Sequence, residues 1–262
     1  MPIWPDVRVP RGPAQTPLVI AHRGASKDHP EHTLAAYERA IHQGADMLEC
    51  DVRLTADGHL VCVHDRRIDR TSDGRGVVST KTLEQLQSRD FGAGTGPASV
   101  LRLEELIELT LDSERPVGLA IETKHPTRYA GLVEQRVVET VRRYGLLRPR
   151  FDPQSRVYLM SFSELALRRW RELAPGVPSV FLMERVPLRC RKGWLPFAAD
   201  VAGPSIEILR EHPGYVQRVQ SAGRQVFVWT VDEPEQVELC RTLGVDALIT
   251  NRPAVARQHL DA

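Results

Sequence analysis

The chain of 262 residues has 35 basic and 34 acidic side chains, a formal net charge of +1, and a hydrophobic content of 42%. The near-neutral charge argues against a general nucleic-acid or anionic-membrane binder, because such proteins use a basic surplus to raise local affinity. The hydrophobic content excludes wholesale disorder, and no apolar run approaches the roughly 20 residues that span a bilayer.

The first residues carry four prolines and no basic-then-apolar signal pattern, so we expect an extended lead-in over residues 1–16. The four cysteines are scattered without a CxxC pair, which indicates free core thiols and not a disulfide framework or a zinc site. These features predict a cytoplasmic protein without a transmembrane segment.

Short apolar runs alternate along the chain with amphipathic stretches of helical period. The predicted strands are rich in Val, Ile, Leu and Ala, as strands covered on both faces are, and comprise residues 17–21, 47–52, 60–64, 117–122, 157–162, 179–183, 201–206, 225–231 and 247–250. The predicted helices comprise residues 33–43, 103–111, 130–144, 163–173, 214–222 and 234–242.

Strands that alternate with helices indicate parallel strands joined by crossovers. About eight such strands in one chain favour a closed (β/α)₈ TIM barrel, an α/β fold, as a single domain over residues 17–262. No GxGxxG follows the first strand, which removes the usual reason to prefer a dinucleotide-binding fold.

One connection breaks the alternation, because only Ala56, Asp57 and Gly58 separate two extended runs. Parallel neighbours need a crossover of roughly a dozen residues, whereas Asp-Gly between extended runs is typical of a hairpin. We therefore expect a β-hairpin after the second strand that places Asp51 opposite His64. A carboxylate and a histidine that are separated in the sequence would then share one site.

Three acidic side chains accompany these strands. Glu49 and Asp51 are two residues apart on one predicted strand, so both leave the same face, although a solvated strand end is the alternative for this pair alone. Glu122 ends another apolar run and Lys124 follows it, and a structural ion pair is the alternative there. Because the C-terminal ends of barrel strands converge on one mouth, the three carboxylates predict a site for Mg²⁺ or Ca²⁺, with zinc less suited to oxygen ligands.

The first strand ends at His22, Arg23 and Gly24. An imidazole titrates near neutrality, a guanidinium offers a planar fork to phosphate, and glycine lets the backbone approach closely. With His64, the chain has two imidazoles at strand ends. Two histidines on opposite sides of a metal-bound phosphate are suited to act as general base and general acid.

Together these motifs resemble the glycerophosphodiester phosphodiesterase family, a (β/α)₈ barrel within a wider phospholipase-C-like group. The resemblance covers nearly the whole chain in family order, through residues 22–24 (HRG), 30–33 (PEHT), 49–52 (ECDV), 55–58, 64–65, 121–124, 161–162, 228–231 and 244–250.

The resemblance implies hydrolysis of a small-molecule glycerophosphodiester to glycerol 3-phosphate and an alcohol, with one divalent cation, Mg²⁺ or Ca²⁺. No nucleic-acid partner is expected, and the oligomeric state stays open. Trp229 is as consistent with a substrate platform as with barrel core. The other roles implied are the acid–base pair His22 and His64, the metal ligands Glu49, Asp51 and Glu122, and the phosphate contacts Arg23 and Lys124.

Two positions depart from the family pattern: His32 replaces the usual asparagine of PENT, and Asn251 replaces the usual aspartate after the last strand. We expect neither to touch the metal, and look for effects on substrate preference or loop stability instead. Glu31 is interpreted as an acid at a helix start. Residues 66–99, with five glycines, are predicted to form a loop excursion over the mouth that is too short for an inserted domain.

Three other functions are compatible with the same fold but fit the sequence less well. A lysophospholipase-D-like or sphingomyelinase-D-like lipid phosphodiesterase would use the same site, but the sequence shows no strongly hydrophobic loop for a membrane surface. A non-catalytic phosphate-binding barrel would typically lack a histidine or a metal acid. An aldolase needs a lysine that forms a Schiff base, for which Lys124 among acids is poorly placed.

Overall fold

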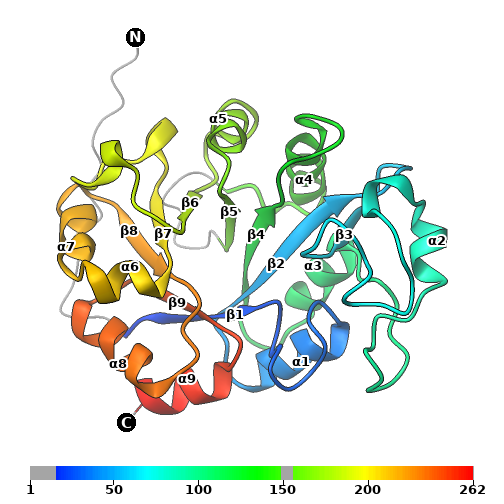
Figure 1. Cartoon of the computed structure of the whole chain (residues 1–262), viewed down its shortest axis with the longest axis horizontal. Coiled ribbons are helices and arrows are strands. Elements are labelled where there is room, and N and C mark those ends of the chain that lie inside the picture. The colour runs from blue at the N-terminus through cyan, green and yellow to red at the C-terminus, as the bar shows by residue number, and fades with distance from the viewer. Residues whose placement is uncertain (1–15, 149–155, 262) are drawn as a thin grey trace.

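The computed structural model describes residues 16–148 and 156–261 (Figure 1). Eight parallel strands close into a barrel in the order β1-β2-β4-β5-β6-β7-β8-β9, with β9 pairing back to β1. The (β/α)₈ fold is therefore confirmed, while the predicted lead-in lies, except for Thr16, outside the described residues. The barrel strands are β1 (Leu18–His22), β2 (Met47–Leu54), β4 (Gly118–Thr123), β5 (Val157–Ser161), β6 (Ser179–Met183), β7 (Val201–Pro204), β8 (Gln225–Val228) and β9 (Ala247–Thr250).

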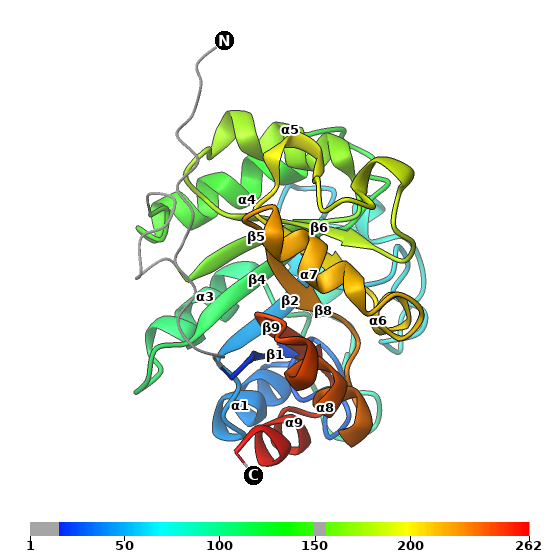
Figure 2. The same ribbon diagram turned by 90° about the vertical axis from the view of Figure 1, so that its left-hand side faces the viewer.

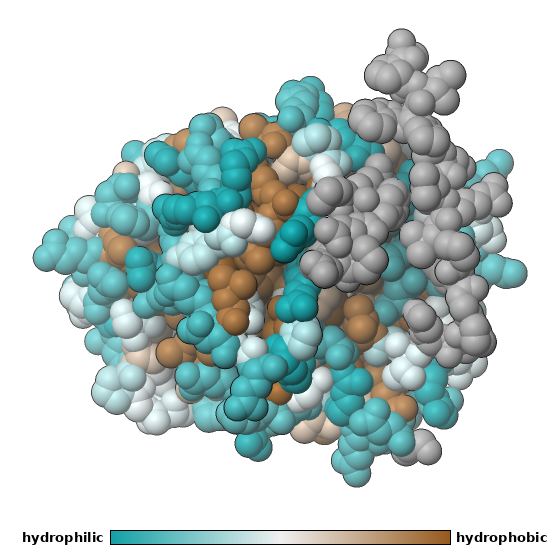
Figure 3. Space-filling model, turned by 180° about the vertical axis from the view of Figure 1, so that it is seen from behind, coloured by the Kyte–Doolittle hydropathy of each residue, from teal (hydrophilic) through white to brown (hydrophobic). Residues whose placement is uncertain are grey.

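Helices surround the strands, as two perpendicular views show (Figures 1 and 2). From behind, hydrophobic patches on the surface lie between hydrophilic ones (Figure 3), a mixture that is ordinary for a folded domain. The barrel helices are α1 (Leu34–His42), α3 (Leu103–Leu111), α4 (Leu132–Arg143), α5 (Glu164–Leu173), α6 (Ile206–Glu211), α7 (Gly214–Ser221), α8 (Pro234–Leu243) and α9 (Pro253–Leu260).

Capping residues are present at several helix ends. The side chain of Thr33 accepts a hydrogen bond from the backbone N–H of Ala36 at the start of α1, and Ser163 caps α5 in the same way. Gly244 ends α8 in the left-handed conformation at φ 65°, where a residue without Cβ is favoured.

The hydrophobic core has two parts, inside the barrel and between the barrel and its helices. Ile20, Met160 and Phe227 belong to the inner cluster, and Tyr37 and Trp170 to the outer one. The inner cluster fills the barrel, so the polar side chains that face inward lie toward the C-terminal ends of the strands.

Strand β2 shows how the sequence sorts its side chains between the two parts. Met47 belongs to the inner cluster, whereas Leu48 and Cys50 belong to the outer one. Because strand side chains alternate, Glu49 and Asp51 follow Met47 into the barrel interior, as predicted.

The predicted hairpin is present, but its register differs from the prediction by one residue. Strand β3 (Leu60–Cys62) runs antiparallel to β2 with Val52 opposite Cys62, and the N–H of Val63 donates to the carbonyl of Asp51 at 2.9 Å. Asp51 therefore lies opposite Val63 and not His64. The reason is a three-residue loop over positions 56–58, with Gly58 at φ 85°, in place of a two-residue turn.

Residues 66–99 fold into more than the predicted loop. They contain a 3₁₀ turn, η1 (Val78–Thr80), and a short helix, α2 (Leu83–Gln87), at the right of Figure 1. Their apolar side chains form a separate small cluster with the β3 region, in which Ile68, Val78, Leu86 and Phe91 are buried. This packing gives the excursion a fixed shape beside the mouth.

Three helices were not predicted: α2, α6 and α9. The predicted strand over residues 201–206 ends at Pro204, and α6 begins at Ile206. Helices α2 and α6, with five and six residues, offer too few turns for a hydrophobic period to stand out. Within the described part of the chain, no helix is long and apolar enough to cross a membrane.

Candidate active site

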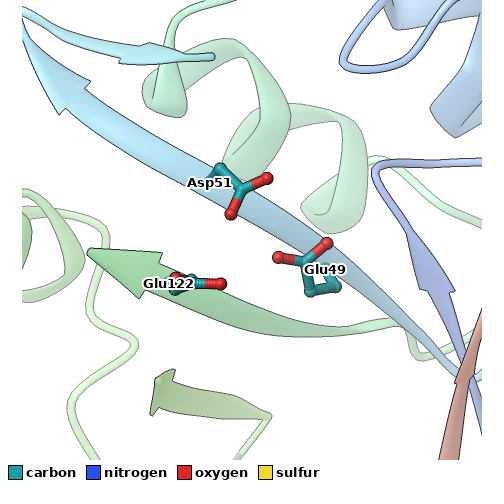
Figure 4. Close-up of side chains that lie close together, drawn as sticks. All are labelled: Glu49, Asp51 and Glu122. Atoms are coloured by element: carbon teal, nitrogen blue, oxygen red, sulfur yellow. The ribbon is translucent and has the colours of Figure 1, made fainter. Parts of the chain in front are cut away.

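Three buried carboxylates meet inside the barrel. Figure 4 shows Glu49 and Asp51 on β2 beside Glu122 on β4, and one oxygen of each lies within 4.8 Å of the others. The register of the two strands causes this meeting, since Asp51 pairs directly with Glu122 in the parallel ladder. The predicted convergence of the three acids is confirmed.

Two cations from neighbouring segments contact the carboxylates. The Nζ of Lys124 lies 2.8 Å from Glu122 Oε1 and 3.3 Å from Asp51 Oδ1. The Nε of Arg23 lies 3.0 Å from Asp51 Oδ2, and its backbone N–H donates to Glu49 Oε2 at 3.0 Å. Both cations contact Asp51, so its negative charge is the best neutralised of the three.

The pKa values of the three acids show how far the nearby cations offset the cost of burying each negative charge. Burial and the charge of Asp51 raise the pKa of Glu122 to about 8 and hold that of Glu49 well above its usual value. Burial also acts to raise the pKa of Asp51, but His32, Lys124 and Arg23 outweigh it and keep that pKa low. Burial therefore makes Glu49 and Glu122 favour their neutral forms, whereas Asp51 keeps its negative charge.

His22, at the end of β1, is held in one tautomer by an amide. Its Nδ1 lies 2.8 Å from Asn251 Oδ1, and because a carbonyl oxygen only accepts, Nδ1 carries the proton and Nε2 keeps its lone pair. The amide is fixed in turn, since Asn251 Nδ2 donates to Asp232 and Ser26 Oγ donates to Asn251 Oδ1. Burial and the charge of Arg23 lower the pKa of His22 to about 4.

His64, beyond β3, has a different partner. Its Nδ1 lies 2.7 Å from a carboxylate oxygen of Asp65, and the Arg53 guanidinium donates from Nε and Nη2 to the His64 carbonyl at 3.1 and 2.7 Å. Burial lowers the pKa of His64, while the charges of Asp51 and Asp65 act in the opposite direction. The two histidines thus differ in whether an amide or a carboxylate holds Nδ1.

Arg70, within the excursion, joins two parts of the site. Its guanidinium donates to Asp65 at 2.7 Å and to Glu31 at 2.7 and 2.8 Å, and Glu31 accepts from Arg23 at 3.2 Å. Although burial raises it, these cations lower the pKa of Glu31 to about 2. The interpretation of Glu31 as a helix-start acid is wrong, because the first turn of α1 contains no acid and Glu31 bridges two arginines.

The two departures from the family pattern both lie at the site. His32 Nε2 is 3.0 Å from Asp51 Oδ2 and its Nδ1 is 2.8 Å from the Tyr37 hydroxyl, while Asn251 holds His22. His32 therefore contacts one of the three clustered acids, which its position before a helix did not indicate. Its backbone has φ 61°, and its side chain is buried against Asp51. The expectation that neither residue touches the metal stays a prediction.

A cavity of about 230 Å³ opens over the acids and is lined on one side by charged groups and on the other by apolar ones. On the apolar side, the Trp229 indole donates to the Gly203 carbonyl at 2.7 Å and meets the Phe162 ring edge-on at 5.4 Å between centroids. The predicted site residues that line the cavity are His22, Arg23, Glu49, His64, Glu122, Lys124 and Trp229. Asp51, the eighth, belongs to the acidic cluster.

Sequence reasoning assigned no site role to several residues around this cavity. Phe162 and Glu184 directly follow β5 and β6, so their strand-end positions alone could have indicated them. Arg53 and Arg70 carried no such signal, since an arginine near a hairpin or in a long loop is ordinarily solvated.

Comparison with known proteins identifies the family. A model of the glycerophosphoryl diester phosphodiesterase family matches residues 22–255. A relative from Mycobacterium tuberculosis (strain ATCC 25618 / H37Rv), "Probable glycerophosphodiester phosphodiesterase 1", is 45% identical over 254 residues, which cover 94% of this chain and 93% of the relative. The glycerophosphodiester phosphodiesterase of Caldanaerobacter subterraneus subsp. tengcongensis is 34% identical, over 90% of this chain and 94% of the relative.

A solved structure agrees with this assignment. The Oleispira antarctica phosphodiesterase in complex with the product sn-glycerol-3-phosphate is 25% identical and superposes with a TM-score of 0.82, over 94% of this chain and 98% of that one. The chain therefore belongs to the glycerophosphoryl diester phosphodiesterase family and is a phosphoric diester hydrolase.

Proposed function

We propose that the protein hydrolyses glycerophosphodiesters to glycerol 3-phosphate and an alcohol, using a divalent cation and two histidines. One observation carries the proposal: three buried carboxylates converge in a cavity that two imidazoles and two cations also line or contact. The product bound to the Oleispira antarctica relative supports the substrate class. We place the enzyme in the cytoplasm because its four cysteines are buried and unpaired.

The residues of the site fit a hard divalent cation. Glu49, Asp51 and Glu122 offer oxygen ligands within 4.8 Å of one another, and burial raises the pKa values of the two glutamates, so a bound cation would favour their charged forms. Mg²⁺ and Ca²⁺ both prefer oxygen ligands. When bound, such an ion polarises the non-bridging phosphate oxygens and stabilises the charge that develops at phosphorus.

His22 is suited to be the general base. With Nδ1–H bound to Asn251 and a pKa of about 4, its Nε2 is free to accept a proton at neutral pH. It takes the proton from the hydroxyl that attacks phosphorus, whether that hydroxyl belongs to water or to the substrate's glycerol.

His64 is suited to be the general acid. The Asp65 carboxylate at Nδ1 acts to raise the pKa of His64 against the lowering effect of burial, and so favours the imidazolium, which then gives its Nε2 proton to the oxygen of the departing alcohol. Arg23 and Lys124 contact the phosphate oxygens, and Trp229 forms a platform for the glycerol or for the head group.

The experiment measures glycerol 3-phosphate release from glycerophosphocholine. We expect EDTA to abolish release and added Mg²⁺ or Ca²⁺ to restore it, with the more effective ion identifying the metal. Lysophosphatidylcholine assayed beside it tests the lipid phosphodiesterase alternative. Equal release in the presence of chelator would contradict the metal dependence, and release from neither substrate would contradict the function.

A further inference from the structure

A second cavity, of about 340 Å³, lies beside the mouth. Its walls are residues 77–80 of the excursion and residues 126–129 of the β4–α4 connection. The hydroxyl of Tyr129 donates to the Ser79 carbonyl at 2.9 Å and joins these two walls. The volume lies within the roughly 300–1,000 Å³ typical of small-molecule sites.

We name this the basic cavity for the charges that line it. Leu54, Val78 and Val133 supply apolar surface, and no aspartate or glutamate lines the cavity. All four of its charged lining residues are cations: Arg53, Arg66, Lys124 and Arg128. An anion is the ligand that such a lining favours.

Three of these cations form no direct ion pair with a carboxylate in the described part of the chain. Among the ion pairs within 4.0 Å in the described residues, none involves Arg53, Arg66 or Arg128; only Lys124 is paired, with the acids of the mouth. Burial lowers the pKa of Arg53, the charges of Asp51, Glu122 and Asp65 act to raise it, and the charge of Arg66 acts to lower it. Since a guanidinium stays protonated in proteins, the basic cavity keeps a surplus of positive charge beside a site for phosphodiesters.

The basic cavity is linked to the catalytic groups at two points. Lys124 lines both cavities, and Arg53, which lines the basic cavity, holds the carbonyl of His64. In the closed strand order β4 lies across the barrel from β8, whose end carries Trp229. A diester centred on the acids therefore has one arm toward Trp229 and the other toward His64 and the basic cavity.

We propose that the basic cavity binds an anionic group, a phosphate or a carboxylate, carried by the alcohol that leaves. This inference rests on the proposed function and adds a substrate class to it. His64 protonates the departing oxygen, so the leaving alcohol lies on its side of the mouth, and the arginines bind the negative charge at the far end of that alcohol.

The test uses two pairs of diesters that differ by one anionic group. Glycerophosphoglycerol is compared with the same diester phosphorylated on its terminal hydroxyl, and glycerophosphoethanolamine with glycerophosphoserine. We expect the anionic member of the phosphate pair to have a kcat/KM about tenfold higher, mainly through a lower KM, and the carboxylate pair to show a smaller preference in the same direction. Both preferences should shrink between about 0.05 and 0.5 M salt, because the arginines are partly solvated.

The double variant Arg66→Ala, Arg128→Ala tests the cavity itself. Both side chains are exposed, so the fold should be retained, and we expect the kcat/KM ratio within each pair to fall close to one. Arg67→Ala is the matched control, because Arg67 is an exposed neighbour that pairs with Asp69 and does not line the cavity. This control should keep the wild-type ratio.

The outcomes separate this inference from the proposed function. A preference that disappears only in the double variant supports the inference. Hydrolysis of the neutral diesters without any preference for anionic ones, or a preference that survives in the double variant, overturns the inference and leaves the proposed function standing. No hydrolysis of any of the four diesters overturns both.

Discussion

The mouth of the barrel has two unlike halves. The charged half comes from β1, β2, β4 and the excursion, and includes the three carboxylates and both histidines. The apolar half comes from β5, β6 and β8, and its cavity-lining side chains include Met160, Phe162, Leu182 and Trp229. In the charged half, burial and neighbouring charges together set the protonation state of each buried group, whereas the apolar half is held by packing.

This difference teaches where the protein is sensitive to change. When one charged side chain is removed from such a group, its partners stay buried without an opposite charge. The loss of stability and activity is therefore large and extends to those partners. When an apolar contact is removed, the buried apolar area decreases only in proportion to the atoms deleted, and so does the stabilisation it provides. The four predictions below measure that contrast, from the largest expected effect to the smallest.

Asp51→Asn in the charged half is expected to reduce diester hydrolysis by about 10³-fold or more, since the metal ligand proposed at this position would supply several kcal/mol of transition-state stabilisation. Asp51 also neutralises Arg23 and Lys124, so Mg²⁺ or Ca²⁺ affinity, measured by calorimetry, should fall as well. Glu184→Gln is the matched control: Glu184 lines the same cavity but lies outside the acidic cluster, and its loss should change kcat/KM less than threefold. Equal losses in the two variants would contradict the contrast.

His22→Ala and His64→Ala should each lower kcat by at least about 10²-fold, the usual scale for a general acid or base. Circular dichroism should show a retained fold, because both side chains line the cavity and neither belongs to the main hydrophobic clusters. Wild-type turnover in either variant would remove that histidine from the mechanism.

Trp229→Leu in the apolar half should raise KM for glycerophosphocholine by about tenfold with a smaller change in kcat, because the indole provides contact surface and no proton. Steady-state kinetics separates the two parameters. A loss in kcat as large as that of a histidine variant would show that the halves are not functionally distinct.

The smallest expected effect is on the pH dependence of thermal stability when metal is removed by a chelator. Because the pKa of Glu122 is about 8 in the folded protein against a usual 4.5, the folded state binds more protons than the unfolded state between these values. Glu122 therefore makes the protein less stable as pH rises through this window. Thermal unfolding in chelator should show a Tm decline from pH 5 to pH 8 that is roughly 5 °C smaller in Glu122→Gln. An identical decline in the two proteins would contradict the raised pKa.

Much of the fold was predictable, because each barrel strand is a short apolar run that is covered on both faces. The acidic cluster was predictable for the same reason: Glu49, Asp51 and Glu122 are acids within buried strands, which is costly without a purpose. The hairpin register was not, because it depends on whether Gly58 adopts a left-handed conformation in a three-residue loop.

Contacts between distant segments also escaped sequence reasoning. His32 precedes a helix, and its contact with Asp51 arises only when the β1–α1 loop turns inward across the barrel. Arg70 lies 39 residues from Glu31, and no period or spacing connects the two. Such pairs are set by the closed barrel, which brings the segments after β1 and β3 together.

The Arg70 contacts have a consequence for protein engineering. Because one guanidinium holds both the carboxylate behind His64 and the one beside Arg23, the mouth cannot be grafted as barrel loops alone. A transplanted mouth that lacks residues 66–99 would need another cation at the position of Arg70, or two separate groups that hold Asp65 and Glu31. Redesigns that shorten this excursion for access to bulkier diesters should therefore retain Arg70 and the packed residues that position it.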